Sequence, residues 1–136
     1  MPGVLLLGNS HWSEMRQHVA SCLPEEACGL IGGKSGQTRL VIPITNDLHS
    51  PDRFRMNPNE QLKGFETLAS HGLDLIAIFH SHPNGPPYPS EVDLVEFAYP
   101  GVFTILWFLK DGIWQAGAFD LEKMAHKKVT LDISGG

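Results

Sequence analysis

Apolar residues recur along this chain in two periods, and each period predicts a different kind of element. Apolar positions three or four residues apart predict a helix from about residue 10 to 22, with a buried face formed by Trp12, Met15, Val19 and Cys22. Short apolar runs predict strands instead, at residues 4–7, 27–31, 39–44, 53–56, 75–79, 102–109, 113–119 and 129–133. The order of these elements predicts an α/β fold with helices packed on a mixed, strongly twisted β-sheet.

Turn and cap residues divide this pattern further. Asn57 followed by Pro58 is typical of a helix start, and the buried face of that helix is predicted to carry Leu62, Phe65, Leu68 and Ala69. Glycines in segments 32–36 and 110–112 predict hairpin turns, because glycine readily adopts the positive φ that these turns require. The proline-rich stretch 83–89 predicts a surface loop, which is either only rigid or also shapes a substrate groove.

Length and charge limit the classes of protein that fit. A chain of 136 residues can bury one core, so a single domain spanning residues 1–136 is expected. An eight-stranded (β/α) barrel hydrolase is excluded, because that fold needs about 250 residues. The net charge of −5 and the pI near 5.7 leave no basic stripe for nucleic acid or for an anionic membrane surface.

Compartment follows from the cysteines and from the apolar runs. No apolar run approaches the roughly 18 residues of a membrane span, and residues 4–7 are too short for a signal-peptide core. We therefore expect a cytoplasmic protein. The chain has two cysteines, and a structural disulfide between Cys22 and Cys28 is not expected in that compartment.

The most informative chemistry follows the apolar strand at residues 75–79. His80 and His82 come directly after it, and side chains two apart on an extended backbone point the same way. Ser90 is placed as the N-cap of a helix predicted over residues 91–97, which brings Asp93 into the first turn. Two imidazoles and a carboxylate can hold zinc and leave a fourth position open for water, as in catalytic zinc sites. The remaining histidines lack such spacing and are interpreted as ordinary: His11, His18, His49, His71 and His126.

Hydrolysis by a zinc-bound water also needs a carboxylate that takes up and returns a proton. Glu25 and Glu26 are the candidates, at the start of a predicted core strand, and spacing alone does not separate them. Ser90 and Asp93 have a second interpretation as a plain helix cap, which is compatible with a catalytic role.

These residues resemble the JAMM/MPN zinc metalloprotease family. The family motif is a distant glutamate, then His-x-His, seven residues, Ser, two residues and Asp, and the chain matches it at Glu26, His80, His82, Ser90 and Asp93. The likeness extends to segments 24–30 and 46–60, where residues 50–58 look like the short prokaryotic branch, and it covers nearly the whole chain. It implies a single MPN-type domain.

The resemblance also implies a role for each matching residue. His80, His82 and Asp93 would bind Zn²⁺, Glu26 rather than Glu25 would be the general acid and base, and Ser90 would donate to the oxyanion. The implied substrates are ubiquitin-like or sulfur-carrier proteins, cleaved at the peptide or isopeptide bond after a C-terminal Gly-Gly. The alternative is a noncatalytic MPN-type scaffold or protein-binding module. Neither the oligomeric state nor a role for the Gly135-Gly136 ending follows from the sequence.

Overall fold

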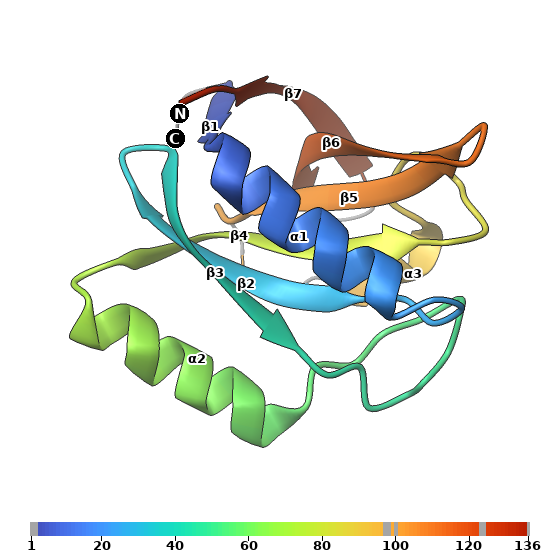
Figure 1. Ribbon diagram of the computed structural model, residues 1–136, viewed down its shortest axis with the longest axis horizontal. Coiled ribbons are helices and arrows are strands. Elements are labelled where there is room, and N and C mark those ends of the chain that lie inside the picture. Colours follow the sequence, from blue (N-terminus) through green and yellow to red (C-terminus); the bar gives the residue numbers. More distant parts are fainter. Residues whose placement is uncertain (1–2, 97–98, 100, 123–124, 136) are drawn as a thin grey trace.

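The strands of this protein form one mixed sheet that closes on itself. In the computed structural model, which describes residues 3–96, 99, 101–122 and 125–135, the strand order is β1-β3-β2-β4-β5-β6-β7. The strands are β1 (Val4–Leu7), β2 (Cys28–Lys34), β3 (Gln37–Ile44), β4 (Asp74–His82), β5 (Phe103–Lys110), β6 (Ile113–Glu122) and β7 (Ala125–Ile133). Helices α1 (Asn9–Ser21) and α2 (Pro58–Ser70) lie against the sheet, and α3 (Glu91–Glu96) is short (Figure 1). The predicted mixed α/β fold is confirmed.

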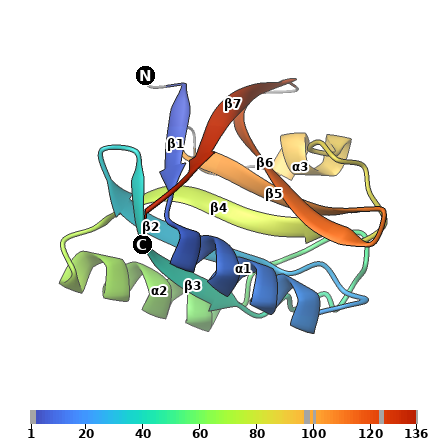
Figure 2. The same ribbon diagram turned by 45° about the horizontal axis from the view of Figure 1, so that its top comes forward.

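Closure of the sheet was not predicted. It results from parallel pairing of β1 with β7, in which Val4 lies opposite Thr130 and Leu7 opposite Ile133. On its other side β1 pairs with β3 through a single position, Leu6 opposite Gln37. Figure 2 shows β1 and β7 side by side near the two ends of the chain.

Both predicted hairpins are present, with tighter turns than expected. Ser35 and Gly36 join β2 to β3 with φ of 51° and 74°, and Asp111 and Gly112 join β5 to β6 with φ of 53° and 77°. Two consecutive residues with positive φ match the right-handed twist of the flanking strands.

Gly32 and Gly33, predicted to lie in the first turn, are residues of β2 instead. A Cβ on Gly32 would overlap the side chain of Leu68 in α2, and one on Gly33 would overlap the carbonyl oxygen of Gln37. These glycines therefore allow close approach of α2 and of β3, rather than a turn.

The two long helices begin near the predicted residues. In α1, Met15 and Val19 are buried as predicted, while the helix runs from Asn9 to Ser21 rather than to Cys22. In α2, the side chain of Asn57 accepts a hydrogen bond from the N–H of Glu60 at 3.0 Å, which confirms it as the N-cap.

The predicted buried face of α2 was partly wrong. Leu68 is buried and Phe65 half-buried, but Leu62 is 59% exposed and Ala69 is also exposed. The helix contacts the sheet through Gly64, where a Cβ would stand 2.7 Å from the Cδ1 of Leu30, so its buried stripe is narrow and displaced from the predicted one.

The strand predicted at residues 53–56 was also wrong. This segment forms one isolated bridge, between Met56 and Asn46, and otherwise runs as a loop beside the sheet. Its apolar residues, Phe54 and Met56, pack into the cluster between α2 and the sheet rather than continuing the sheet. Apolar packing of a loop mimicked the pattern of a strand.

Strand β4 separates two apolar clusters and positions the candidate site. Ala77 and Phe79 belong to the cluster that α1 covers, and Ile78 packs on the side of α2. His80 and His82 therefore share the face of Ile78, at the end of the strand. Among the described residues, none of the helices combines the length and the apolar content needed to cross a bilayer.

Candidate metal centre

The two histidines of the His-x-His segment lie together within β4. The strand extends through both of them, instead of ending before them as predicted, because β2 pairs with it as far as His80 and β5 as far as His82. The ring centroids of His80 and His82 are 5.1 Å apart, and both residues are buried. Ser81 points to the opposite side, where its hydroxyl accepts a hydrogen bond from the N–H of Ala27 at 2.8 Å. Ser81 thus binds β4 to the backbone that precedes β2.

Of the two adjacent glutamates, Glu26 lies beside the His-x-His segment and Glu25 does not. Glu26 is 3% exposed, and its Oε1 lies 3.7 Å from Nδ1 of His80. The Oε1 of Glu25 lies 3.0 Å from Nδ1 of His49 in an exposed pair away from this cluster. The backbone geometry at the start of β2 therefore separates two carboxylates that spacing alone left equivalent.

A second carboxylate reaches the histidines from α3. The Oδ2 of Asp93 lies 3.0 Å from Nε2 of His82 and 3.8 Å from Nε2 of His80. Ser90 holds Asp93 in place, because its N–H donates to Oδ2 at 2.8 Å and its Oγ accepts from the N–H of Asp93 at 3.2 Å. This reciprocal pair forms the predicted helix cap, and residue 97 of the predicted helix lies outside the described residues.

Hydrogen bonds orient the ring of His82. Its Nδ1 lies 2.8 Å from the carbonyl oxygen of Pro86, an acceptor, so Nδ1 donates to it and Nε2 faces His80 and Asp93. Burial alone would lower the pKa of His82, but the hydrogen bonds to Asp93 and to Pro86 raise it above its ordinary value. Burial alone would raise the pKa of Asp93, but the hydrogen bond from His82, the nearby His80 and the N–H of Ser90 lower it instead.

Two polar atoms of the cluster lack a hydrogen-bond partner among the described residues. Oε1 of Glu26 and Nδ1 of His80 are buried and have no hydrogen-bond partner within the described part of the chain. Such orphaned groups cost about 1–3 kcal/mol each when nothing compensates them. Glu26, His80 and His82 each offer a ligand atom, and these atoms lie within 4.8 Å of one another. Imidazole and carboxylate donors so placed form a candidate metal site.

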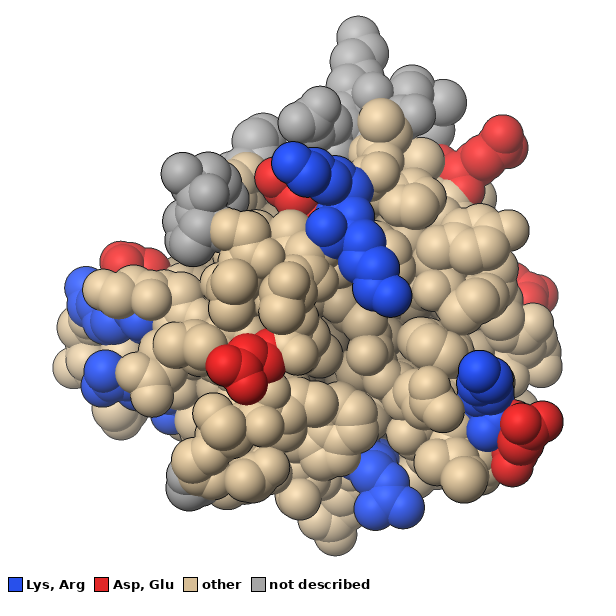
Figure 3. Space-filling view, turned by 90° about the horizontal axis from the view of Figure 1, so that it is seen from above, with Lys and Arg blue, Asp and Glu red and all other residues tan. Residues whose placement is uncertain are grey.

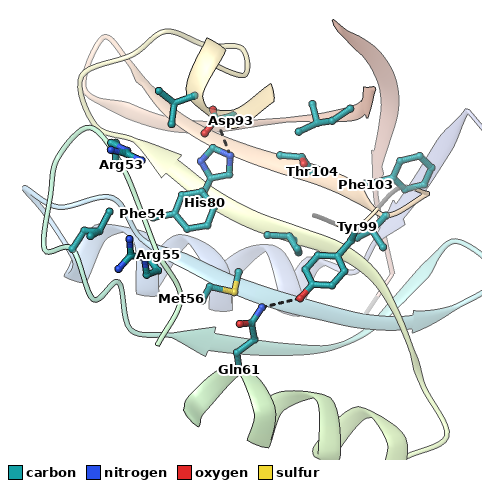
Figure 4. A pocket seen from close by; sticks show the side chains of 15 residues that line it. Arg53, Phe54, Arg55, Met56, Gln61, His80, Asp93, Tyr99, Phe103 and Thr104 are labelled. Atoms are coloured by element: carbon teal, nitrogen blue, oxygen red, sulfur yellow. Dashed lines mark hydrogen bonds and ion pairs between the residues drawn. The ribbon is translucent and has the colours of Figure 1, made fainter. Parts of the chain in front are cut away.

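A cavity of about 340 Å³ opens beside these residues. Figure 4 shows His80 and Asp93 pointing toward one another above the ring of Phe54, with Gln61 and Tyr99 further along the same cavity. Gln61 Nε2 donates to the hydroxyl of Tyr99 at 3.1 Å. Most other lining side chains are apolar, two are arginines and one is a threonine: Leu48, Met56, Ile78, Val92, Val102, Phe103, Leu121, Arg53, Arg55 and Thr104. This cavity, called the groove below, is therefore bordered by two residues of the candidate metal site, His80 and Asp93.

Two residues of the site were missed by the sequence interpretation. The ring of Phe54 stacks on His80, with centroids 4.7 Å apart and planes at 26°. Asn46 is buried and binds the backbone of Glu26. Both lie in segment 46–60, which carries part of the family likeness, but no periodicity distinguished them from other loop residues. Tyr88, in the proline-rich loop, does not line the cavity and stacks on His126 instead.

Comparisons with known proteins identify the family of this chain. Residues 8–122 match the family model for prokaryotic homologs of the JAB domain. A desampylase of Pyrococcus furiosus is 39% identical over 62% of this chain and 60% of its own length. A "Probable TtuB-protein conjugate cleaving protease" of Thermus thermophilus is 36% identical over 81% of this chain and 73% of its own. A CysO-cysteine peptidase of Mycobacterium tuberculosis is 31% identical over 79% of this chain and 75% of its own.

Solved structures show the same fold. A protein of Desulfitobacterium hafniense superposes with a TM-score of 0.86 and 28% identity, over 97% of this chain and 94% of that one. A JAB1/MPN domain protein of Archaeoglobus fulgidus superposes with a TM-score of 0.59 and 18% identity, over 96% of this chain and 97% of that one, which supports the fold alone. Since the family model spans most of the chain, this protein belongs to the prokaryotic homologs of the JAB domain, within the JAMM/MPN family.

Proposed function

We propose that this protein is a zinc-dependent peptidase that hydrolyses the peptide or isopeptide bond after the C-terminal Gly-Gly of a ubiquitin-like or sulfur-carrier protein. One observation carries this proposal: two imidazoles and two carboxylates meet, buried, at the end of a groove. The names of three relatives, a desampylase, a conjugate-cleaving protease and a CysO-cysteine peptidase, support this substrate class.

His80, His82 and Asp93 would hold the zinc ion in this proposal. Nε2 of both histidines faces Oδ2 of Asp93, and Nδ1 of His82 is engaged with the Pro86 carbonyl, which leaves Nε2 of His82 to bind metal. When bound, zinc supplies a Lewis acid that polarises the scissile carbonyl and lowers the pKa of a coordinated water to about 7.

Glu26 and Ser90 would carry out the proton transfer and the charge stabilisation. The unpartnered Oε1 of Glu26 can accept a proton from the attacking water and return it to the leaving amine. The Oγ of Ser90 accepts from the N–H of Asp93, so its own hydrogen is left to donate to the carbonyl oxygen as negative charge develops.

The groove supports an extended apolar tail as the substrate. Its apolar lining, which includes Phe54, Met56, Val92 and Phe103, continues to His80 and Asp93. We infer that residues without side chains are preferred next to the metal, because Phe54 stacks directly on His80 and takes up the space beside it.

The partner in this proposal is a protein rather than a nucleic acid. The chain has a net charge of −5, and the face in Figure 3 carries separated acidic and basic side chains with one short basic row. Cys22 and Cys28 are both free, which supports a reducing, cytoplasmic location.

The proposal is tested with Glu26→Gln and, as a matched control, Glu25→Gln. A carrier protein joined through its Gly-Gly terminus to a lysine-containing fluorescent peptide serves as the substrate, and zinc per chain is measured by elemental analysis. We expect about one zinc in the wild type and in both variants. Glu25→Gln should cleave like the wild type, and Glu26→Gln should lose about 100-fold or more of the turnover, the typical contribution of a positioned general base.

Two outcomes would contradict the proposal. If Glu26→Gln retains most of the turnover, Glu26 is not the proton carrier. If the zinc-loaded wild type binds the conjugate but does not cleave it, the scaffold alternative is correct.

A further inference from the structure

Asn46 is a buried polar residue whose side chain forms hydrogen bonds, within the described part of the chain, with Glu26, Leu48, Arg53 and Arg55 rather than with the histidines or Asp93. It follows β3, is 6% exposed, and forms the isolated bridge with Met56 that closes loop 46–56. This loop contributes one wall of the groove, through its residues 53–56. A buried amide side chain needs hydrogen-bond partners, and the position of those partners indicates what the residue holds together.

The Asn46 amide is fully used, and its partners lie on three segments. Nδ2 donates to the carbonyl oxygen of Glu26 at 3.1 Å and to that of Arg53 at 3.0 Å. Oδ1 accepts from the N–H of Leu48 and from the N–H of Arg55, both at 3.0 Å. Both donors and both acceptors of the amide are therefore engaged.

Loop 46–56 forms hydrogen bonds with both backbone polar groups of Glu26, its N–H and its carbonyl oxygen. The N–H of Glu26 donates to the carbonyl oxygen of Ser50 at 2.8 Å, and its carbonyl accepts from Asn46. The Asn46 amide also binds the backbone of Arg53 and of Arg55. These two residues flank Phe54, whose ring stacks on His80. One side chain thus connects the backbone of Glu26 to the groove wall.

We propose that Asn46 is a positioning residue that couples the groove wall to Glu26, so that the segment contacting the substrate and the carboxylate that moves the proton keep a fixed relative position. This inference rests on the proposed function. A shift of about 1 Å in a reacting group can cost about 100-fold in rate, so a residue that fixes two parts of a site affects catalysis without touching the substrate.

The chemistry of the amide makes the inference specific. Asn46→Asp keeps the size and the two acceptors, but it replaces both donors by carboxylate oxygen facing two carbonyl groups. The links to Glu26 and Arg53 are lost, while those from Leu48 and Arg55 can remain. Asn46→Ala removes all four hydrogen bonds and adds no charge.

The test compares both variants with Asn57→Ala. Asn57 caps α2 in the same region; its side chain forms hydrogen bonds with Asp47 and Glu60, and it is not among the described residues that line the groove. Turnover and KM are measured with the Gly-Gly conjugate, zinc per chain by elemental analysis, and tail affinity by calorimetry in a Glu26→Gln background. Amide hydrogen exchange of the metal-free protein reports on Glu26 and Arg55 directly.

We expect Asn46→Asp to lower kcat about tenfold or more and to weaken tail binding several-fold, with zinc per chain unchanged. Asn46→Ala should show the same losses, and its exchange should accelerate at the N–H of Arg55 and of Glu26 together. Asn57→Ala should keep kcat within twofold. Asn46→Ala also decides the question if the aspartate variant does not fold.

The inference is overturned if kcat is unchanged in the Asn46 variants, or if Asn57→Ala loses as much. A wild type that cleaves no conjugate would remove the proposed function alone. Exchange would then decide the coupling: faster exchange at Arg55 with no change at Glu26 would show that Asn46 does not connect them.

Discussion

Ser81 links β4 to Ala27 on the face opposite the two histidines, and Ser81→Ala measures how much this link contributes to the stability of the protein. Its hydroxyl is buried and accepts the N–H of Ala27 at 2.8 Å, while its own N–H donates to the carbonyl of Ala27 at 3.1 Å. Removing the hydroxyl leaves the Ala27 N–H buried without a partner, which costs about 1–3 kcal/mol. The change in volume is small, so we assign nearly all of the loss to this one hydrogen bond.

Urea unfolding measures this loss. With a slope of about 2 kcal/mol/M, typical of small domains, the unfolding midpoint should fall by roughly 0.5–1.5 M without a change in slope. Ser70→Ala is the matched control, because the Ser70 hydroxyl donates to the carbonyl of Thr67 in an exposed position. Its midpoint should move by no more than about 0.25 M, since exposed substitutions stay within about 0.5 kcal/mol. Equal midpoints for the two variants would refute the reasoning, because the Ala27 N–H would then have another partner.

Two further predictions concern stability. Burial raises the pKa of the Cys28 thiol to about 12, above its unfolded value near 9, so the folded state favours the neutral thiol. The contribution of this thiol to the free energy of unfolding is fully present below pH 9 and decreases as the pH rises toward 12, by up to about 1.4 kcal/mol per pH unit. Cys28→Ala should remove this pH dependence when the free energy of unfolding is measured across that range. In α2, Leu68→Ala should lower the free energy of unfolding, measured in urea, by about 2–5 kcal/mol, because Leu68 is 3% exposed. Leu62 is 59% exposed, so Leu62→Ala should lower it by less than about 1 kcal/mol. Equal losses would contradict the observed orientation of the helix.

Local patterns predicted the elements well where a single periodicity or a single residue type decides the structure. The hairpin at Gly112, the cap at Asn57 and the strand before His80 each depend on neighbours in the sequence, and all three are present. The strand at residues 53–56 failed because burial of Phe54 against α2 and the sheet imitates the pattern of a strand.

The candidate site likewise has parts that the sequence predicts and parts that depend on distant segments. The convergence of His80 and His82 follows from the two-residue period of a strand. The choice between Glu25 and Glu26 does not, because it depends on how loop 46–56 binds the backbone of Glu26 from a distance in the sequence. The role of Asn46 could not be predicted for the same reason, because its four hydrogen-bond partners are brought together only by the folded loop.

The pairing of β1 with β7 has a consequence for how the protein is made. Val4 pairs with Thr130 and Leu7 with Ile133, so β1 leaves the ribosome well before β7, the strand with which it pairs over most of its length. At about 5–20 residues per second, β1 waits roughly 6–25 s with only its single position opposite β3 available. Closure of the sheet therefore cannot precede the synthesis of β7, and until then β1 and β6 lack the partner that β7 supplies.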